Sequence, residues 1–144
     1  REVPGDSGPV EEPTRRVLHL ARARRRTRFG GVAIQWHLGR TREPRRPTFQ
    51  KGVEVFDADC VGPVVELRHW RPGDRFQPIG MARPVKLQDL FVNAKIPRQR
   101  RHELIVAATP AGEIWWVEGL RIGEKFKVTP ATVRRLHWRW GRSG

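Results

Sequence analysis

Hydrophobic side chains recur at every second position in several short stretches of the chain, a pattern that is typical of strands. Val32, Ile34 and Trp36 alternate with other residues directly after Gly30-Gly31, and an arginine-rich run at 25–29 precedes the two glycines. Two strand-like runs that are separated by Gly-Gly predict a β-hairpin.

More strands are expected further along the chain. The candidates are residues 52–56, 64–68, 104–108, 113–119 and 136–140. Gly62-Pro63 separates the first two candidates, and Gly112 lies at the turn of a second hairpin, between the third and the fourth. In the last candidate, Leu136, Trp138 and Trp140 alternate with polar residues, which predicts a closing strand.

One segment has a helical period instead. Leu87, Leu90, Phe91 and Ala94 follow the i, i+3, i+4, i+7 spacing of a single buried helix face. Pro97 then suits the first turn of a second short helix. Many short strands together with one helical pair predict an α+β fold, a small strand-rich domain that is preceded by the β-hairpin segment.

The charge of the chain says more about its partners than about its fold. The 144 residues include 29 Lys and Arg against 15 Asp and Glu, a formal net charge of +14. A balance this basic favours association with polyanions, nucleic acid first and an anionic membrane surface second. No apolar run approaches the roughly 18 residues that would span a bilayer, and no signal peptide is evident.

The amino-terminal part is basic or polar throughout. Residues 1–14 have the composition of a polar Pro/Gly linker, and because the chain begins at Arg1 rather than Met, we expect it to be a piece of a longer protein. Residues 22–28 carry five arginines and no acidic residue. Such a block is either a solvated face of a strand or helix or a nucleic-acid contact, and the sequence leaves both open.

Catalytic and metal-binding constellations are not apparent. The two serines lie near the ends of the chain, and the lone Cys60, expected to be a buried thiol, forms no disulfide or thiolate cluster. The five histidines show no metal-ligand spacing, and two of them, His37 and His137, are expected to be packing or rim residues of strands. Asp57 and Asp59 either hold a metal ion or, as we prefer, bond local backbone amides in a turn. We therefore expect no catalytic residue and no metal in this chain.

The stretch "RPGDRFQPIG" at 71–80 is predicted to be a rigid basic loop. Pro72-Gly73 fits the centre of a type II turn, with Arg71 and Arg75 emerging on either side of it. Asp74 could orient one of these guanidiniums for bidentate phosphate contact. Alternatively, Asp74 and Arg75 form an internal pair that only fixes the loop.

Residues from about 64 to 140 resemble the C-terminal domain of bacterial tRNA(Ile)-lysidine synthetase. Four motifs of that family occur in order, Arg-Pro-Gly-Asp-Arg-Phe at 71–76, Lys-Leu-x-Asp-Leu-Phe at 86–91, Lys-Ile-Pro-x-x-x-Arg at 95–101 and Trp-Val-x-Gly-Leu-Arg-Ile at 116–122. The resemblance implies a β-sandwich-like fold related to a module of the phenylalanyl-tRNA synthetase β subunit. It divides the chain into a linker (1–14), a basic hairpin or linking region (15–60) and the lysidine synthetase C-terminal domain (61–141).

The resemblance also implies a function. Enzymes of this family use ATP to join lysine to the wobble cytidine of the isoleucine tRNA with a CAU anticodon, in an amino-terminal PP-loop domain. The Ser-Gly-Gly-x-Asp-Ser motif of that domain does not occur in this chain. The implied role is therefore tRNA docking on the acceptor-stem side in the cytoplasm, without catalysis and without a cofactor of its own. ATP and magnesium would belong to the PP-loop domain.

The expected tRNA-binding residues are cations in and around the four motifs. In order of preference they are first Arg71, Arg75, Lys86, Lys95, Arg98, Arg100 and Arg101, and then Arg121, Lys125 and Lys127. Trp115 and Trp116 are expected on opposite faces of one strand, both in the core or with one of them stacking on a base. The alternative function is a module that packs on its own catalytic domain or forms a homodimer, without RNA contact.

Overall fold

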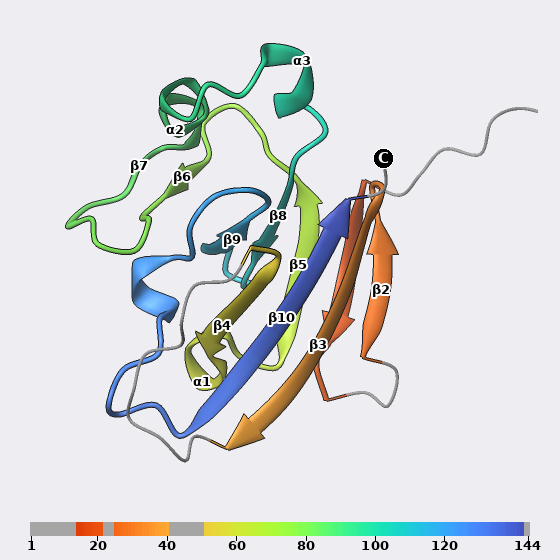
Figure 1. Ribbon diagram of the computed structural model, residues 1–144, viewed down its shortest axis with the longest axis vertical. Coiled ribbons are helices and arrows are strands. Elements are labelled where there is room, and N and C mark those ends of the chain that lie inside the picture. Colours follow the sequence, from red (N-terminus) through yellow and green to blue (C-terminus); the bar gives the residue numbers. More distant parts are fainter. Residues whose placement is uncertain (1–13, 22–24, 41–50, 143–144) are drawn as a thin grey trace, which may run out of the picture.

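The computed structural model of the protein describes residues 14–21, 25–40 and 51–142, whose backbone forms two four-stranded antiparallel sheets (Figure 1). The first sheet has the order β1-β5-β8-β9 and contains β1 (Arg15–His19), β5 (Val64–His69), β8 (Ile105–Ala108) and β9 (Ile114–Val117). The second has the order β2-β3-β10-β4 and contains β2 (Arg26–Phe29), β3 (Val32–Arg40), β10 (Arg134–Arg142) and β4 (Val53–Asp57). The predicted strand-rich α+β fold is confirmed.

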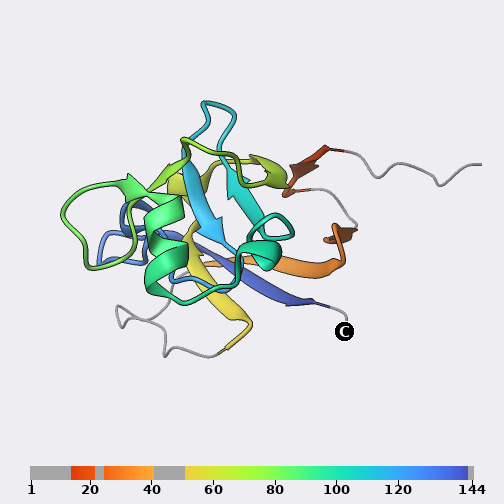
Figure 2. The ribbon, with the colours of Figure 1, turned by 90° about the horizontal axis from the view of Figure 1, so that it is seen from above.

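The remaining elements are short. They are the two-stranded ribbon of β6 (Arg75–Phe76) and β7 (Val85–Lys86), the helices α1 (Ala58–Val61), α2 (Leu87–Asn93) and α3 (Arg98–Arg101), and the 3-10 helix η1 (Glu124–Phe126). Figure 1 shows α2 and α3 at the upper end of the molecule, and Figure 2, which looks onto that end, shows them in front of the strands. The predicted helical pair is therefore present, and α1 is an addition that the sequence did not reveal.

The β2–β3 hairpin forms where the double glycine predicts it. Gly30 and Gly31 have φ angles of 56° and 85°, which glycine adopts without the steric cost that a side chain would add. Phe29 pairs with Val32 on either side of this turn. The turn therefore sets the register of the hairpin, in which Val32, Ile34 and Trp36 are buried.

The hydrophobic core lies between the two sheets. Alternate residues of the second sheet, among them Ile34, Phe56 and Trp138, point inwards and pack with Leu67 and Ile105 of the first sheet. The alternation predicted for the closing strand is thus confirmed, since Leu136 and Trp138 are fully buried. β10 lies in the middle of its sheet, paired with both β3 and β4.

A second, smaller core lies on the other side of the first sheet. Leu87 and Phe91 of α2 pack there against Val106 and Ala108 of β8, whereas Ile105 and Ala107 of the same strand face the main core. Because β8 is covered on both faces, all four of its residues are buried and its hydrophobic pattern does not alternate. Of the predicted helical face, Leu90 is only partly buried, and Ala94 is exposed because α2 ends at Asn93.

The expectation that Trp115 and Trp116 point to opposite faces is wrong. Between Ala107, opposite Trp116, and Ala108, opposite Ile114, the register shifts by one residue. Such a β-bulge puts two consecutive side chains on the same side of the sheet. Both indoles are therefore fully buried in the main core, where their ring centroids lie 4.9 and 5.6 Å from that of Trp138. Neither can stack on a base.

Residues 15–60 contribute strands to both sheets. β1 pairs with β5, and β4 pairs with β10, so this segment shares the main core with the rest of the chain. The domain boundary at residue 60 stays a prediction. Residues 1–13, which hold almost all of the expected linker, and 22–24 of the arginine-rich block lie outside the described residues.

Candidate nucleic-acid interface

The loop that follows β5 turns as predicted. Gly73 has a φ of 95°, and the Asp74 N–H donates to the Arg71 carbonyl over 3.0 Å. These are the features of a turn with Pro72-Gly73 at its centre and a left-handed second residue, as in type II. The loop returns through β6, which pairs with β7.

The Asp74 carboxylate binds neither the Arg71 nor the Arg75 side chain, so both sequence-based interpretations of Asp74 are wrong. Its two carboxylate oxygens accept from Nη1 and Nη2 of Arg68, at 2.9 and 3.0 Å, and one of them also accepts from the Arg71 N–H at 2.7 Å. Arg68 is only 6% exposed. A buried guanidinium needs a carboxylate partner, and Asp74 is the one that the turn brings within reach.

Three cationic side chains, which we call the loop cations, are left exposed by this arrangement. They are Arg71 before the turn, Arg75 on β6 and Lys86 on β7. Within residues 14–21, 25–40 and 51–142, none of their side chains forms an ion pair. Arg75 and Lys86 are direct cross-strand neighbours, an arrangement of like charges that destabilises a sheet. An anion bound between them would relieve that repulsion.

A groove of about 390 Å³ runs from this ribbon to η1. Arg75 and Lys125 both line it. The Lys125 Nζ lies 3.4 Å from Glu113, yet its side chain remains 63% exposed. Lys127 is paired with Glu124 and only 25% exposed. Of these two expected RNA contacts, Lys125 lies in the groove beside the loop cations, whereas Lys127 stabilises η1.

Another group of cations surrounds α3. Lys95, Arg98 and Arg100, which we call the helix cations, are exposed and form no ion pair among the described residues. Lys95 adopts a left-handed φ of 58° between α2 and α3, a conformation that is uncommon for residues other than glycine. Arg101 differs from them, because its Nε donates to the Ile96 carbonyl over 2.9 Å and fixes this connection.

Arg121 lies beside a buried carboxylate. Glu54 of β4 is 7% exposed, and this burial raises the pKa of Glu54 to about 7, against the opposing effect of the Arg121 charge. Arg121 therefore stabilises the charged form of a buried residue of the fold. The expected cations thus separate into the loop cations with Lys125, the helix cations, and three residues with structural partners, Arg101, Arg121 and Lys127.

The acidic residues near α1 have structural roles. Asp57 is the N-cap of α1 and accepts from the N–H groups of Asp59 and Cys60, and from the Thr132 hydroxyl at 2.8 Å. Asp59 binds Arg134. In the described part of the chain, no three His, Cys, Asp or Glu side chains lie close enough to hold a metal ion.

Cys60 is exposed, so the expectation of a buried thiol is wrong; α1, which was not foreseen, places the side chain on its outer side. Partial burial and the nearby Asp57 carboxylate raise the pKa of the Cys60 thiol. A raised pKa keeps the thiol protonated, which is the opposite of what a nucleophile needs.

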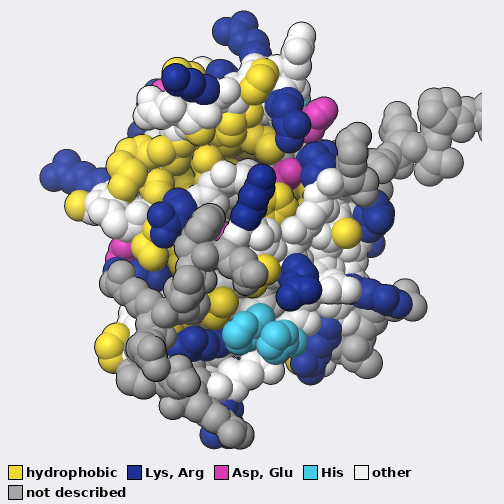
Figure 3. Space-filling view, in the orientation of Figure 1, with side chains coloured by type: hydrophobic (Ala, Val, Ile, Leu, Met, Phe, Trp, Pro, Cys, Tyr) yellow, Lys and Arg dark blue, Asp and Glu magenta, His cyan; other side chains and the backbone are white. Residues whose placement is uncertain are grey.

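The surface seen in Figure 3 carries many Lys and Arg side chains and few acidic ones. None of the helices in the described residues is long and apolar enough to span a membrane. Sequence reasoning missed Arg68, because β5 also contains Glu66 and His69 and nothing in its pattern marks Arg68 as the buried charge.

The chain is similar to several known proteins. It is 43% identical over 86 residues to a tRNA(Ile)-lysidine synthase of Clostridium acetobutylicum, which covers 60% of this chain and 18% of that protein. It is 39% identical over 90 residues to the corresponding protein of Caldanaerobacter subterraneus subsp. tengcongensis, covering 61% and 19%. The matched part therefore spans less than a fifth of these curated relatives.

Two solved structures are similar as well. The crystal structure of a TilS C-terminal domain superposes with a TM-score of 0.65 and 27% identity, covering 80% of this chain and 87% of that one. An N-terminal fragment of the phenylalanyl-tRNA synthetase β subunit from Pyrococcus horikoshii matches with a TM-score of 0.51 and 17% identity, over 62% and 28%, and this likeness shows the fold alone.

The family model described as the TilS substrate C-terminal domain matches residues 65–138, which run from β5 into β10. This segment includes the turn with its Asp74–Arg68 pair, the loop cations, the helix cations and η1. Because this match extends over about half of the chain, the chain belongs to the TilS C-terminal domain family.

Proposed function

We propose that this chain is the tRNA-docking part of a tRNA(Ile)-lysidine synthetase and has no catalytic activity by itself. The observation that carries the proposal is the set of loop cations, which a turn fixed by the buried Asp74–Arg68 pair presents to solvent. Guanidinium groups that extend from a fixed turn suit phosphate oxygens, because their planar set of donors matches two phosphate oxygens at once and loses little side-chain freedom per hydrogen bond. Duplex RNA is recognised largely through its backbone and shape, which such a surface can contact.

In the whole enzyme, a PP-loop domain elsewhere in the polypeptide would bind ATP and magnesium. It would adenylate the wobble cytidine of the isoleucine tRNA with a CAU anticodon, and lysine would then displace AMP. This chain would hold the same tRNA towards its acceptor stem, in the cytoplasm. The role is compatible with the formal net charge of +14 and with the curated relatives, which are tRNA-modifying enzymes.

The proposal is tested by measuring the affinity of the 144-residue chain for a transcript of that tRNA between about 50 and 300 mM salt. Each neutralised duplex phosphate contributes about −0.9 to the slope of log K against log[salt]. We expect a slope of several units, reduced by about two in the double variant Arg75→Gln/Lys86→Gln. Arg15→Gln is the matched control, because Arg15 is already paired with Glu66 at 2.8 Å.

Weak binding with no salt dependence would contradict the proposal. Sedimentation of the same sample separates it from the alternative, since a stable dimer without RNA affinity would identify a packing or dimerisation module. We also expect no ATP turnover by this chain, with or without the tRNA.

A further inference from the structure

The outer face of the second sheet is cationic and lies outside the loop and helix cations. Arg26, Arg28, Arg135 and Arg139 point away from the core here, and among the strand residues that the structure describes the one acidic residue facing outwards is Asp57. Asp57 is buried, and its oxygens are taken by two backbone N–H groups and the Thr132 hydroxyl. In the described strands, this face therefore presents no available carboxylate to a partner.

The strand register places five of the outward side chains in two adjacent rows. Arg26 pairs with Gln35 and Gln35 with Arg139, while His37 pairs with His137 two residues further along β3 and β10. With strands about 4.8 Å apart and about 3.4 Å between successive residues, the first row is about 10 Å long, the second is about 5 Å long, and the two lie about 7 Å apart. Arg26 and Arg139 form no ion pair within residues 14–21, 25–40 and 51–142.

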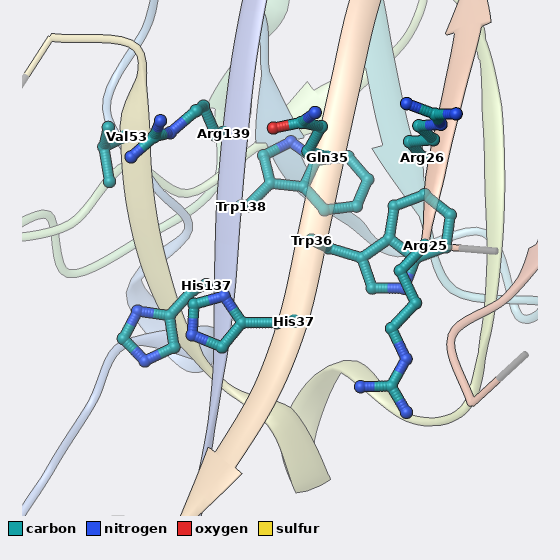
Figure 4. Close-up of a pocket in the computed structure, with 9 residues that line it drawn as sticks. All are labelled: Arg25, Arg26, Gln35, Trp36, His37, Val53, His137, Trp138 and Arg139. Atoms are coloured by element: carbon teal, nitrogen blue, oxygen red, sulfur yellow. The ribbon is translucent and has the colours of Figure 1, made fainter. Parts of the chain in front are cut away.

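The two histidines lie against each other at the centre of this face. Their ring centroids are 4.2 Å apart and the ring planes differ by 6°. Figure 4 shows the two imidazoles side by side on β3 and β10, beside a hollow of about 640 Å³ that Arg26 and Arg139 also line. Figure 3 shows histidine side chains at the surface, with Lys and Arg side chains around them.

We propose that this outer sheet face is a second RNA contact, in which Arg26 and Arg139 bind phosphodiester oxygens and the His37–His137 pair takes up a proton as the RNA binds. The inference rests on the proposed function, because it assigns the same class of ligand to a separate surface. A polynucleotide suits the face better than a small anion, since the two arginines lie at opposite ends of a row about 10 Å long.

Proton uptake follows from what surrounds the histidines. The charged groups on this face around the pair, from the described elements, are Arg135 and Arg139 on β10, Arg26 on β2 and Arg25 before it. On β4, Val53 and Val55 lie opposite Arg139 and His137, and Asp57 lies opposite Arg135. Burial, together with His37 and Arg135, lowers the pKa of His137 below its ordinary value. A phosphate placed beside the rings acts in the opposite direction and raises that pKa, so binding and protonation support each other.

The first test is the salt dependence of tRNA binding by the 144-residue chain. The variant Arg26→Gln/Arg139→Gln removes two phosphate contacts, so the slope of log K against log[salt] should fall by about 1.4–1.8 and affinity at about 0.1 M salt by about 10- to 100-fold. Arg134→Gln is the control on the same strand, because Arg134 is bound to Asp59 at 2.9 Å. It should leave the slope unchanged.

The second test is the pH dependence. Affinity of the unmodified chain should rise as the pH falls from about 7.5 to 5.5, and the variant His37→Gln/His137→Gln should lose most of that rise. Nuclear magnetic resonance signals of the two imidazoles should shift on addition of the tRNA. A saturable shift of the same size with inorganic phosphate at matched ionic strength would overturn the assignment to RNA.

The outcomes separate this inference from the proposed function. If Arg75→Gln/Lys86→Gln weakens tRNA binding while Arg26→Gln/Arg139→Gln does not, the proposed function stands and the second contact is wrong. If the unmodified chain has no salt-dependent affinity for the tRNA, both fail. If both double variants reduce the slope and the control does not, both are supported.

Discussion

Two arginines beside one turn have opposite roles, although both carry the same guanidinium group. Arg68 is buried and bound through two nitrogens to Asp74, whereas Arg75, the next residue after that aspartate, is exposed and lies opposite another cation, Lys86. The first pair determines the shape of the loop, and the second gives the loop a charge that nothing in the described structure neutralises. A high arginine content therefore does not reveal which arginines stabilise the fold and which can bind an anion; the partner of each guanidinium does.

The same division appears elsewhere in the molecule. Arg142 donates through Nε and Nη2 to the buried Glu118, at 2.6 and 2.8 Å, and this hydrogen bonding raises the pKa of Arg142. Arg139, three residues earlier on β10, has no such partner among the described residues. Substitutions of the paired arginines should thus change stability, and substitutions of the others should change binding.

Asp74→Ala should have the largest effect on stability. It removes both short hydrogen bonds from the buried Arg68 guanidinium to a carboxylate and leaves only the 3.9 Å contact of Arg68 Nε with Glu66, so the free energy of unfolding should fall by up to about 3–5 kcal/mol. The control is Asp59→Ala, which removes the exposed pair with Arg134 and should cost about 1 kcal/mol or less. Urea denaturation of both variants measures the difference, and equal losses would show that the Asp74–Arg68 pair contributes no more than a surface pair.

Glu54→Gln should raise stability in a manner that depends on pH. The pKa of Glu54 is about 7 in the folded protein and about 4.5 as its ordinary value, so the folded state is destabilised as the pH rises from about 4.5 through 7. At pH 8 the variant should be more stable than the unmodified chain by about 3 kcal/mol, and at pH 4 nearly equal to it. Denaturation at both pH values checks this, and a constant difference would contradict it.

Arg75→Gln/Lys86→Gln should separate stability from binding. Removing two like charges that face each other across the ribbon should leave the free energy of unfolding unchanged or raise it by about 0.2–1 kcal/mol. The same variant is expected to lose tRNA affinity. A thermal unfolding curve beside the binding isotherm measures both, and a marked loss of stability would mean that these residues belong to the fold.

The smallest effect is expected from Glu113→Gln. Its pair with Lys125 is exposed on both sides, so its removal should change the free energy of unfolding by less than about 0.5 kcal/mol. The Lys125 ammonium would then face the groove without a competing carboxylate, and tRNA affinity should increase slightly. A decrease would indicate that Glu113 holds Lys125 in a position that RNA needs.

Local patterns predicted most of the secondary structure. The Gly30-Gly31 hairpin and the alternation of Leu136 and Trp138 are confirmed because a turn type and a period of two depend only on neighbouring residues. The bulge at Trp115 was not predictable, because it arises from the register of β9 against β8. Burial of β8 on both faces likewise depends on α2, which lies elsewhere in the chain.

The candidate interface was predictable in its residue types and less so in its partners. Motifs at 71–76, 86–91 and 95–101 located the loop and helix cations, which the structure leaves exposed. The contacts of Arg101 with the Ile96 carbonyl and of Arg121 with Glu54 follow no short charge pattern, whereas the i, i+3 spacing of Glu124 and Lys127 is visible in the sequence and was not used. The stacked pair of His37 and His137 requires residues 100 positions apart to meet across β3 and β10.

The central place of β10 in its sheet affects how the molecule is made. Ribosomes deliver residues one after another, at about 5–20 per second, and non-local strand pairings form slowly. β3 and β4 are separated by the one strand that emerges after all the others, so both must wait with an unpaired edge until residues 134–142 have been synthesised. A nascent chain that stops before β10 would expose unpaired edges on β3 and β4. We therefore expect chaperones to bind it during translation.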